Sequence, residues 1–273
     1  MDQREAQREK AGLFRRLHSG PEMLVLPNAW DGISARIVEA EGFAAIATSS
    51  AGVAGVLGYP DGQRIPRNEM LFMVKKIVEA VSVPVTADVE AGYDDPVRTA
   101  LDVIESGAIG MNLEDMVNHE LIPLAQQVET VRKILAAANT TGVPIVLNAR
   151  TDIFLTKHGD ESTRFNRAVE RLNAFHDAGA DCLFAPGVTD PETIGRLTSV
   201  LKGPLNILAG PGIPTIPELK RLGVKRLSVG SGTSRVALGA LRRFVRQMRD
   251  EGTMTPLATE AVPYPEVQKL MTR

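Results

Sequence analysis

The 273-residue sequence has a single cysteine, Cys182, and no long apolar run. One cysteine excludes an internal disulfide framework and is typical of proteins in a reducing compartment. No run approaches the roughly 20 apolar residues of a membrane-spanning helix, and the charged N-terminal residues lack the apolar region of a secretory signal. We therefore expect a cytoplasmic protein with no membrane partner.

An excess of charge of one sign is also missing. Thirty-one Lys and Arg residues nearly balance 33 Asp and Glu residues, giving a formal net charge of -2, so no overall basic field would attract nucleic acid. The sequence has no His/Cys cluster of the kind that binds zinc. It also has no Gly-x-Gly-x-x-Gly turn after the first predicted strand, which disfavours an open dinucleotide-binding sheet.

A recurring unit organises the chain: a helical pattern ends at a glycine, and a short apolar strand follows. Glycine suits the left-handed position that closes a helix, and continuous apolar runs suit parallel strands buried on both faces. The eight predicted strands cover residues 23–26, 44–48, 84–87, 109–113, 144–148, 181–184, 205–208 and 226–229. Eight strands alternating with helices predict an α/β fold, a single (β/α)8 TIM-type barrel domain over residues 1–273.

Both ends of the chain extend this barrel. Residues 1–20 predict an extra amphipathic helix, with Leu13, Phe14 and Leu17 on its apolar side, and His18 is interpreted as a surface residue. Residues 253–273 contain three prolines and predict an extended C-terminal arm that packs elsewhere.

Acidic side chains gather where predicted strands end, which is where barrel enzymes carry their active sites. Asp88 and Glu90 follow the third strand on the same side of the chain, Glu114 follows the fourth, and Asp61 lies in the long loop after the second. Crowded carboxylates repel one another unless a cation or a proton lies among them, and oxygen ligands favour Mg²⁺ or Mn²⁺. The alternative is a solvated rim of ion pairs.

Two further features at the strand ends suit an anionic ligand. The turn of Ser49, Ser50 and Ala51 offers small side chains and backbone N–H groups that can hold a carboxylate or an oxyanion, or it is simply a tight turn. Arg150 directly follows the fifth strand and can clamp a carboxylate, or it can pair with Glu114.

Three other residues have less specific signals. His119 lies in the loop after the fourth strand, and histidine is the one residue type there that can serve as an acid or base near pH 7. Trp30 is interpreted as a wall of the pocket or as a packing anchor. Cys182 lies in the sixth strand, so we expect it in the core.

Six segments in order carry a resemblance to a known family: 26–31 (LPNAWD), 48–54 (TSSAGVA), 57–61 (LGYPD), 86–92 (TADVEAG), 112–115 (NLED) and 148–152 (NARTD). Over residues 24 to 235 the chain resembles the isocitrate lyase / phosphoenolpyruvate mutase superfamily. It is most similar to the phosphonomutase-like (carboxyvinyl-carboxyphosphonate phosphorylmutase-like) branch.

The resemblance implies a Mg²⁺ site in which Asp88 is the nearest ligand, and Asp61, Glu90 and Glu114 act largely through water. It also implies an enzyme that acts on a small 2-oxo acid and makes or breaks a C–C or P–C bond through a metal-held enolate or related oxyanion.

The resemblance further implies that Ser49, Ser50 and Ala51 bind the substrate carboxylate and oxo group, and that Arg150 contacts the substrate. Members of the superfamily commonly pair subunits by exchanging the last helix. We therefore expect a homo-oligomer, a dimer or a tetramer, in which the arm is swapped between subunits.

The segment 115–122 departs from the pattern of the superfamily. Its lyases carry Lys-x-Cys-Gly-His in the lid after the fourth strand, and its mutases carry Lys-x-Asn-Ser, whereas this lid has no lysine and no cysteine. The isocitrate and methylisocitrate lyase reactions are therefore not expected, and His119 is left as the catalytic acid or base of the lid.

Two alternatives stand beside this interpretation. The turn Gly230-Ser231-Gly232 after the eighth strand fits a barrel enzyme that binds a phosphorylated metabolite. The altered lid also fits a catalytically degenerate protein that binds 2-oxo acids without turning them over.

Overall fold

The computed structural model describes residues 2–272, so Met1 and Arg273, the outermost residues of the predicted helix and arm, lie outside it. The helices are α1 (Gln3–Ser19), α2 (Gly32–Ala40), α3 (Ser50–Val56), α4 (Arg67–Ala80), α5 (Pro96–Glu105), α6 (Leu124–Thr140), α7 (Glu161–Asp177), α8 (Pro191–Val200), α9 (Ile216–Arg221), α10 (Gly232–Glu251), α11 (Pro256–Thr259) and α12 (Tyr264–Met271). The strands are β1 (Leu24–Leu26), β2 (Asn28–Ala29), β3 (Ile46–Thr48), β4 (Val85–Asp88), β5 (Gly110–Glu114), β6 (Met116–Val117), β7 (Glu120–Leu121), β8 (Val146–Arg150), β9 (Cys182–Phe184), β10 (Leu205–Leu208) and β11 (Arg226–Ser228).

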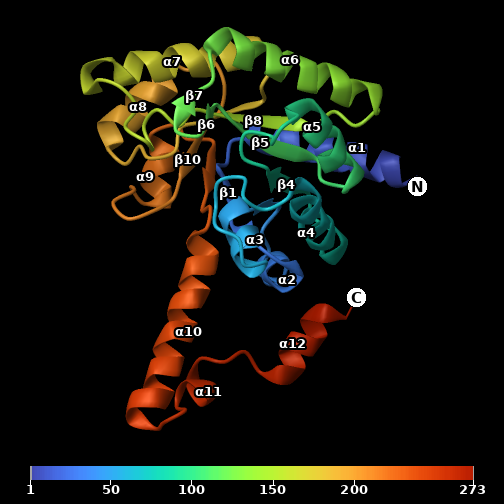
Figure 1. The fold of residues 1–273 in the computed structure, drawn as a ribbon, viewed down its shortest axis with the longest axis vertical. Helices are drawn as coiled ribbons and strands as arrows, with labels where there is room; N and C mark the ends of the chain where they lie inside the picture. Colours follow the sequence, from blue (N-terminus) through green and yellow to red (C-terminus); the bar gives the residue numbers. More distant parts are fainter. Residues whose placement is uncertain (1, 273) are drawn as a thin grey trace.

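All the strands given above except the antiparallel pair β6 and β7 form a parallel barrel (Figure 1). The order is β1-β11-β10-β9-β8-β5-β4-β3-β2, and the ring closes because β1 and β2 are the two halves of one strand, interrupted at Pro27. Proline has no N–H to give to a strand ladder, which explains the break. Each of the eight predicted strands overlaps a barrel strand, so the predicted TIM-type barrel is confirmed.

The side chain of Asn28 bridges the barrel at this break. Its Oδ1 accepts from the backbone N–H groups of Val229 (2.8 Å) and Gly230 (2.9 Å), and its Nδ2 donates to the carbonyl oxygen of Thr48 (2.7 Å). One amide thus joins the first strand to both of its neighbours, in place of part of the backbone ladder.

Helix α1 crosses the amino ends of the strands, opposite the expected active-site end. Phe14 is fully buried there, and Arg15 forms an ion pair with Asp181 (2.6 Å) at the start of β9. Leu13, however, is 41% exposed, and His18 is only 2% exposed. The interpretation of His18 as a surface residue is therefore wrong, because its ring packs edge-on against Phe14 and its Nδ1 lies 2.8 Å from the Phe14 carbonyl oxygen.

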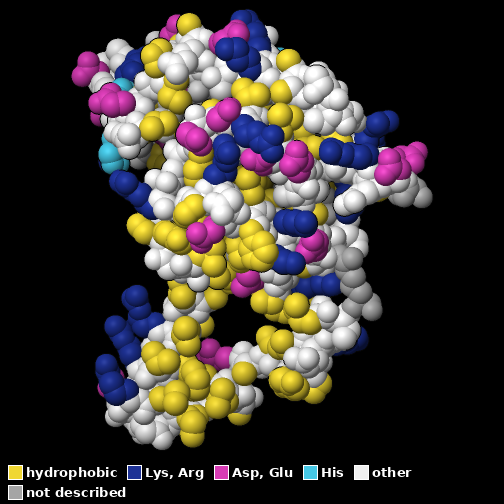
Figure 2. Space-filling view, turned by 45° about the vertical axis from the view of Figure 1, so that its right-hand side comes forward, with side chains coloured by type: hydrophobic (Ala, Val, Ile, Leu, Met, Phe, Trp, Pro, Cys, Tyr) yellow, Lys and Arg dark blue, Asp and Glu magenta, His cyan; other side chains and the backbone are white. Residues whose placement is uncertain are grey.

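The C-terminal part projects from the barrel as an arm of α10, α11 and α12, whose last helix returns to contact α2 (Figure 1). The projection begins earlier than the predicted arm, because within α10 only Ser234 is buried. Figure 2 shows apolar side chains gathered on this arm, and those most exposed along α10 are Val236, Leu238, Leu241, Val245 and Met248. Among the helices of residues 2–272, none is long and apolar enough to cross a membrane.

Candidate active site

An open cavity of about 850 Å³ lies at the carboxyl ends of the strands. The polar residues that line it come from the loop after α3, from the ends of β4, β5 and β8, and from the segment β6–β7. The charged and imidazole side chains among them are Asp61, Arg64, Arg67, Glu90, Asp94, Glu114, His119, Arg150 and Asp152. The cavity therefore brings together three of the four predicted metal ligands, Arg150 and His119.

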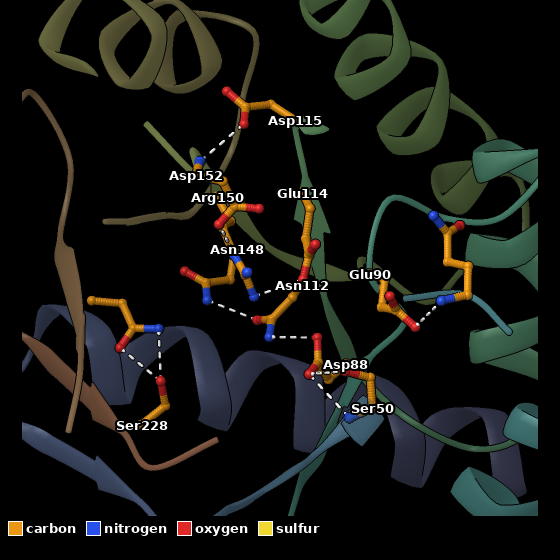
Figure 3. Close-up of polar contacts among 12 residues, drawn as sticks. Ser50, Asp88, Glu90, Asn112, Glu114, Asp115, Asn148, Arg150, Asp152 and Ser228 are labelled. Atoms are coloured by element: carbon orange, nitrogen blue, oxygen red, sulfur yellow. Dashed lines mark hydrogen bonds and ion pairs between the residues drawn. The ribbon is translucent and has the colours of Figure 1, made fainter. Parts of the chain in front are cut away.

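Asp88, the fourth predicted ligand, is buried as the last residue of β4 (Figure 3). Its Oδ2 accepts hydrogen bonds from the backbone N–H (3.1 Å) and the hydroxyl (3.0 Å) of Ser50, and its Oδ1 accepts from Nδ2 of Asn112 (3.2 Å). No Lys or Arg among residues 2–272 forms an ion pair with this carboxylate. Neutral donors alone thus orient it.

The predicted substrate turn lies at the start of α3. Ser49 caps this helix by accepting from the N–H of Gly52 (3.2 Å), and the donors of Ser50 are engaged with the acid of β4. Trp30 packs in a small core cluster, and its Cβ would lie 2.9 Å from a Cβ added to Gly52. Ser49, Ser50, Ala51 and Trp30 are not among the described residues that line the cavity.

Arg150 is held between two acids at the end of β8 (Figure 3). Its Nη1 lies 2.6 Å from Glu114 Oε1, its Nε lies 2.6 Å from Asp152 Oδ1, and the guanidinium carbon is 5.6 Å from the centre of the Phe184 ring. Burial by itself would lower the pKa of Arg150. The two acids together raise this pKa by more than burial lowers it, so the net shift is upward and the side chain stays charged. The closest contacts of the two ion pairs use Nη1 and Nε.

The acids at the rim have more negative charge than Arg150 can balance. Burial raises the pKa of Glu90 to about 7 against the opposing hydrogen bond from the Gln63 N–H, and neighbouring acids raise it further. Burial also raises the pKa of Asp61 and that of Glu114, where Arg150 opposes the shift. An opposite charge close to these acids would favour their ionised forms.

The acids surround the cavity without forming a compact ligand set. Within residues 2–272, no three His, Cys, Asp or Glu side chains lie close enough together to hold a metal ion by themselves. Asp88 is tied to Ser50, Glu90 to Gln63, and Glu114 to the arginine of β8.

The segment after β5 is a small hairpin, β6–β7, over the cavity. Asn118 and His119 form its two-residue turn with φ angles of 50° and 66°, the pair of positive values expected of a type I′ turn. Arg171 of α7 holds the base, with Nε 2.5 Å from Asp115 Oδ2 and with Nη2 donating to the carbonyl oxygen of Ile122 (2.7 Å). The hairpin therefore presents His119, which is exposed, at the edge of the cavity.

Comparison with known proteins gives the family. The sequence model of the phosphoenolpyruvate phosphomutase family matches residues 14–249, which is most of the chain. The chain belongs to this family. The resemblance to the isocitrate lyase / phosphoenolpyruvate mutase superfamily is thereby confirmed, and the protein is an enzyme of that superfamily.

Three relatives show how far the similarity extends. The chain is 30% identical over 279 residues to 2,3-dimethylmalate lyase of Eubacterium barkeri, covering 96% of this chain and 93% of that protein. A crystal structure from Burkholderia cenocepacia J2315, provisionally described as a lyase/mutase, is 35% identical with a TM-score of 0.91 over 98% of both chains. Oxaloacetate acetylhydrolase in complex with oxalate is 26% identical with a TM-score of 0.84, covering 96% of this chain and 93% of that one.

Sequence reasoning assigned no role to several residues that contact the acids of the candidate site. Asn112 and Asn148 lie two residues before Glu114 and Arg150, and Nδ2 of Asn148 donates to Oδ1 of Asn112 (2.8 Å). Side chains two residues apart in a strand point to the same face of the sheet. Counting back two residues from Glu114 and Arg150 would therefore have indicated Asn112 and Asn148. Gln63, which holds Glu90 from an irregular loop, left no comparable signal.

Proposed function

We propose that the protein is a Mg²⁺- or Mn²⁺-dependent enzyme that acts on a small 2-oxo acid, making or breaking a C–C or P–C bond. The observation that supports this best is the carboxylate of Asp88, which forms no ion pair with a Lys or Arg of residues 2–272 and lies beside a cavity bordered by Asp61, Glu90 and Glu114. A dimethylmalate lyase and an oxalate-bound oxaloacetate hydrolase among its relatives support the substrate class.

The donor set fits a hard divalent cation. All four acids offer oxygen, the ligand type that Mg²⁺ prefers. Burial first, and then neighbouring acids, raise the pKa values of Asp61, Glu90 and Glu114, and a cation would favour their ionised forms. Because the described acids do not form a three-ligand cluster, we propose that Asp88 is the direct ligand and that Asp61, Glu90 and Glu114 act largely through water. Mg²⁺ commonly keeps several waters in protein sites.

The metal would supply Lewis-acid stabilisation of an enolate or related oxyanion. Arg150 would orient the substrate by donating to its carboxylate while Glu114 and Asp152 hold the guanidinium in place. The turn of Ser49, Ser50 and Ala51 is the proposed second contact for the carboxylate and oxo group, which a ligand would reach beside Asp88, the acid to which Ser50 donates. Trp30 packs close to the same turn.

His119 is the proposed acid or base, because the hairpin presents its imidazole at the cavity and imidazole is the side-chain group most often used for proton transfer. The lid contains no cysteine, and it contains no lysine to neutralise the additional carboxylate of a tricarboxylate. Small 2-oxo acids such as phosphonopyruvate or oxaloacetate therefore fit the site better than branched tricarboxylates.

Calorimetric titration with Mg²⁺ and oxalate, a mimic of pyruvate enolate, tests the proposal. Wild-type protein should bind oxalate only with Mg²⁺, and Asp88→Asn should weaken Mg²⁺ binding by at least roughly 10–100-fold, because it removes the ligand charge but keeps the shape. Glu129→Gln, which alters an exposed acid of α6, is the matched control and should bind as wild type does. Equal Mg²⁺ affinity in wild type and Asp88→Asn would refute the metal assignment.

A turnover screen separates the proposal from its alternatives. Mg²⁺-dependent oxalate binding without turnover of any 2-oxo acid would favour the degenerate binding protein. The phosphorylated-metabolite alternative has less support, because the N–H groups of Val229 and Gly230 already donate to Asn28 rather than facing a ligand.

We further propose that the protein works in the cytoplasm as a homo-oligomer, a dimer or a tetramer, with the arm packed against a second copy. The exposed apolar side chains of α10, including Leu238, Leu241 and Val245, lie at the three- and four-residue spacing of a helix-packing stripe. A second copy of the same arm is an occupant with a matching apolar face.

A further inference from the structure

One buried charge inside the barrel is not used by the proposed mechanism. Arg226 of β11 is completely buried, and among residues 2–272 no carboxylate forms an ion pair with it. Its Nε has no hydrogen-bond partner. The buried arginine of α7 differs, since Arg171 pairs with Asp115 at 2.5 Å. An unpaired buried charge is costly, so its presence calls for an explanation.

The contacts of Arg226 lead in two directions. Towards the barrel floor, Nη1 lies 3.4 Å from Nε2 of His18, and the guanidinium carbon lies 5.7 Å from the centre of the Phe14 ring. Towards the cavity, Nη2 donates to Oδ1 of Asn112 (3.4 Å). The side chain thus lies between helix α1 and the polar residues beneath the candidate site.

Asn112 connects this charge to Asp88. Its Oδ1 faces two donors, Arg226 and Asn148, so its Nδ2 must face the opposite side, where it donates to Oδ1 of Asp88 (3.2 Å; Figure 3). A single side-chain amide therefore separates the guanidinium from the carboxylate. In an interior of low dielectric, the charge polarises that amide and strengthens the bond it donates.

We propose that Arg226 is a positioning residue of the candidate site, a buried counter-charge that orients Asp88 through Asn112 and favours an anionic ligand in the cavity above. The ligand part of this inference rests on the proposed function. The link through Asn112 rests on the contacts alone.

Neutral and charged variants of Arg226 test the proposal by Mg²⁺-dependent oxalate titration. Arg226→Met and Arg226→Gln should each weaken oxalate binding by about 10-fold, which corresponds to about 1.4 kcal/mol, whereas Arg226→Lys should stay within about 3-fold of wild type. Arg226→Met should also leave Tm unchanged or higher, because no carboxylate loses its partner. Arg171→Met is the control. It should lower Tm because it leaves the buried carboxylate of Asp115 without its ion-pair partner.

Two results would overturn the proposal. The first is that Arg226→Met and Arg226→Gln both bind oxalate as tightly as wild type does. The second is that neither variant folds, which would make Arg226 a purely structural residue. If wild-type protein does not bind oxalate, the proposed function fails but this inference stays testable. The side-chain amide resonance of Asn112 in ligand-free protein, assigned with Asn112→Ser, should then shift in Arg226→Gln and remain near its wild-type position in Arg226→Lys. An unshifted resonance in Arg226→Gln would refute the link.

Discussion

Acid should destabilise this protein through His18, a residue far from the cavity. Its Nδ1 lies 2.8 Å from the Phe14 carbonyl oxygen, so this nitrogen carries the proton, and Nε2 is left to accept from Arg226 (3.4 Å). A second proton would place an N–H against a guanidinium N–H in a buried space. Burial first, and then the charge of Arg226, lower the pKa of His18 to about 3.

The direction and size of the effect follow from linkage. The unfolded chain has an ordinary histidine pKa of about 6.5, so between pH 6.5 and about 3 the unfolded state binds more protons than the folded state. Stability from this residue is complete above pH 6.5 and falls by roughly 1.4 kcal/mol per pH unit below it. At pH 5 the loss is about 2 kcal/mol, which for a chain of this length lowers Tm by about 4 °C.

Thermal unfolding at pH 7 and pH 5 measures this loss when wild type is compared with His18→Gln. The glutamine amide can donate to the Phe14 carbonyl oxygen and does not titrate, and all carboxylates and the other histidines are common to both proteins. The Tm of wild type should fall by about 4 °C more than that of the variant. An equal fall in both proteins, or an NMR titration of His18 near pH 6.5, would refute the reasoning.

Four further outcomes are expected. Arg150→Lys should lower kcat/KM for any 2-oxo acid turned over by roughly 10–100-fold, the loss of about 1.5–3 kcal/mol of charged hydrogen bonding, and an unchanged kcat/KM would contradict its role. Gly187→Ala should lower the free energy of unfolding, measured in urea, by about 2 kcal/mol or more, because the φ of Gly187 is 87° and the new Cβ would lie 2.6 Å from Leu155 Cα. Gly212→Ala is the control and should lower this free energy by less, because its φ is 81° but no described atom lies within 4 Å of the new Cβ. Leu241→Asp should reduce the molar mass by light scattering to that of one chain, and an unchanged mass would place the oligomer contact elsewhere. Turnover of 2-methylisocitrate should be negligible, and robust cleavage by purified protein would show an acid outside the lid.

Much of the barrel was predictable because parallel strands buried on both sides leave continuous apolar runs, and helix-closing glycines mark where they start. The start of the projecting arm was not predictable, because the apolar residues of α10 have the same helical period whether they face a core or lie exposed. His18 was misinterpreted for a similar reason: only the packing of α1 across the barrel floor shows which face of that helix is buried.

The candidate site was predictable in part. Strand ends supplied Asp88, Glu114 and Arg150, since residues at the carboxyl ends of parallel strands meet at one edge of the barrel. The partners that orient them were harder to find. Strand alternation indicates Asn112. Arg226, however, lies on another strand and contacts the site through the side-chain amide of Asn112, and no local sequence pattern reveals such a contact.

The break at Pro27 has a mechanical consequence. Because the ring closes where the first and last strands meet, that seam holds the barrel shut, and the seam depends on the side chain of Asn28 as well as on the ladder. The hydroxyl of Thr233, in the first turn of α10, donates to the Asn28 carbonyl oxygen (2.5 Å), so the root of the arm is fastened to the same residue. A displacement of α10 would therefore act directly on the residue that joins the first strand to its neighbours.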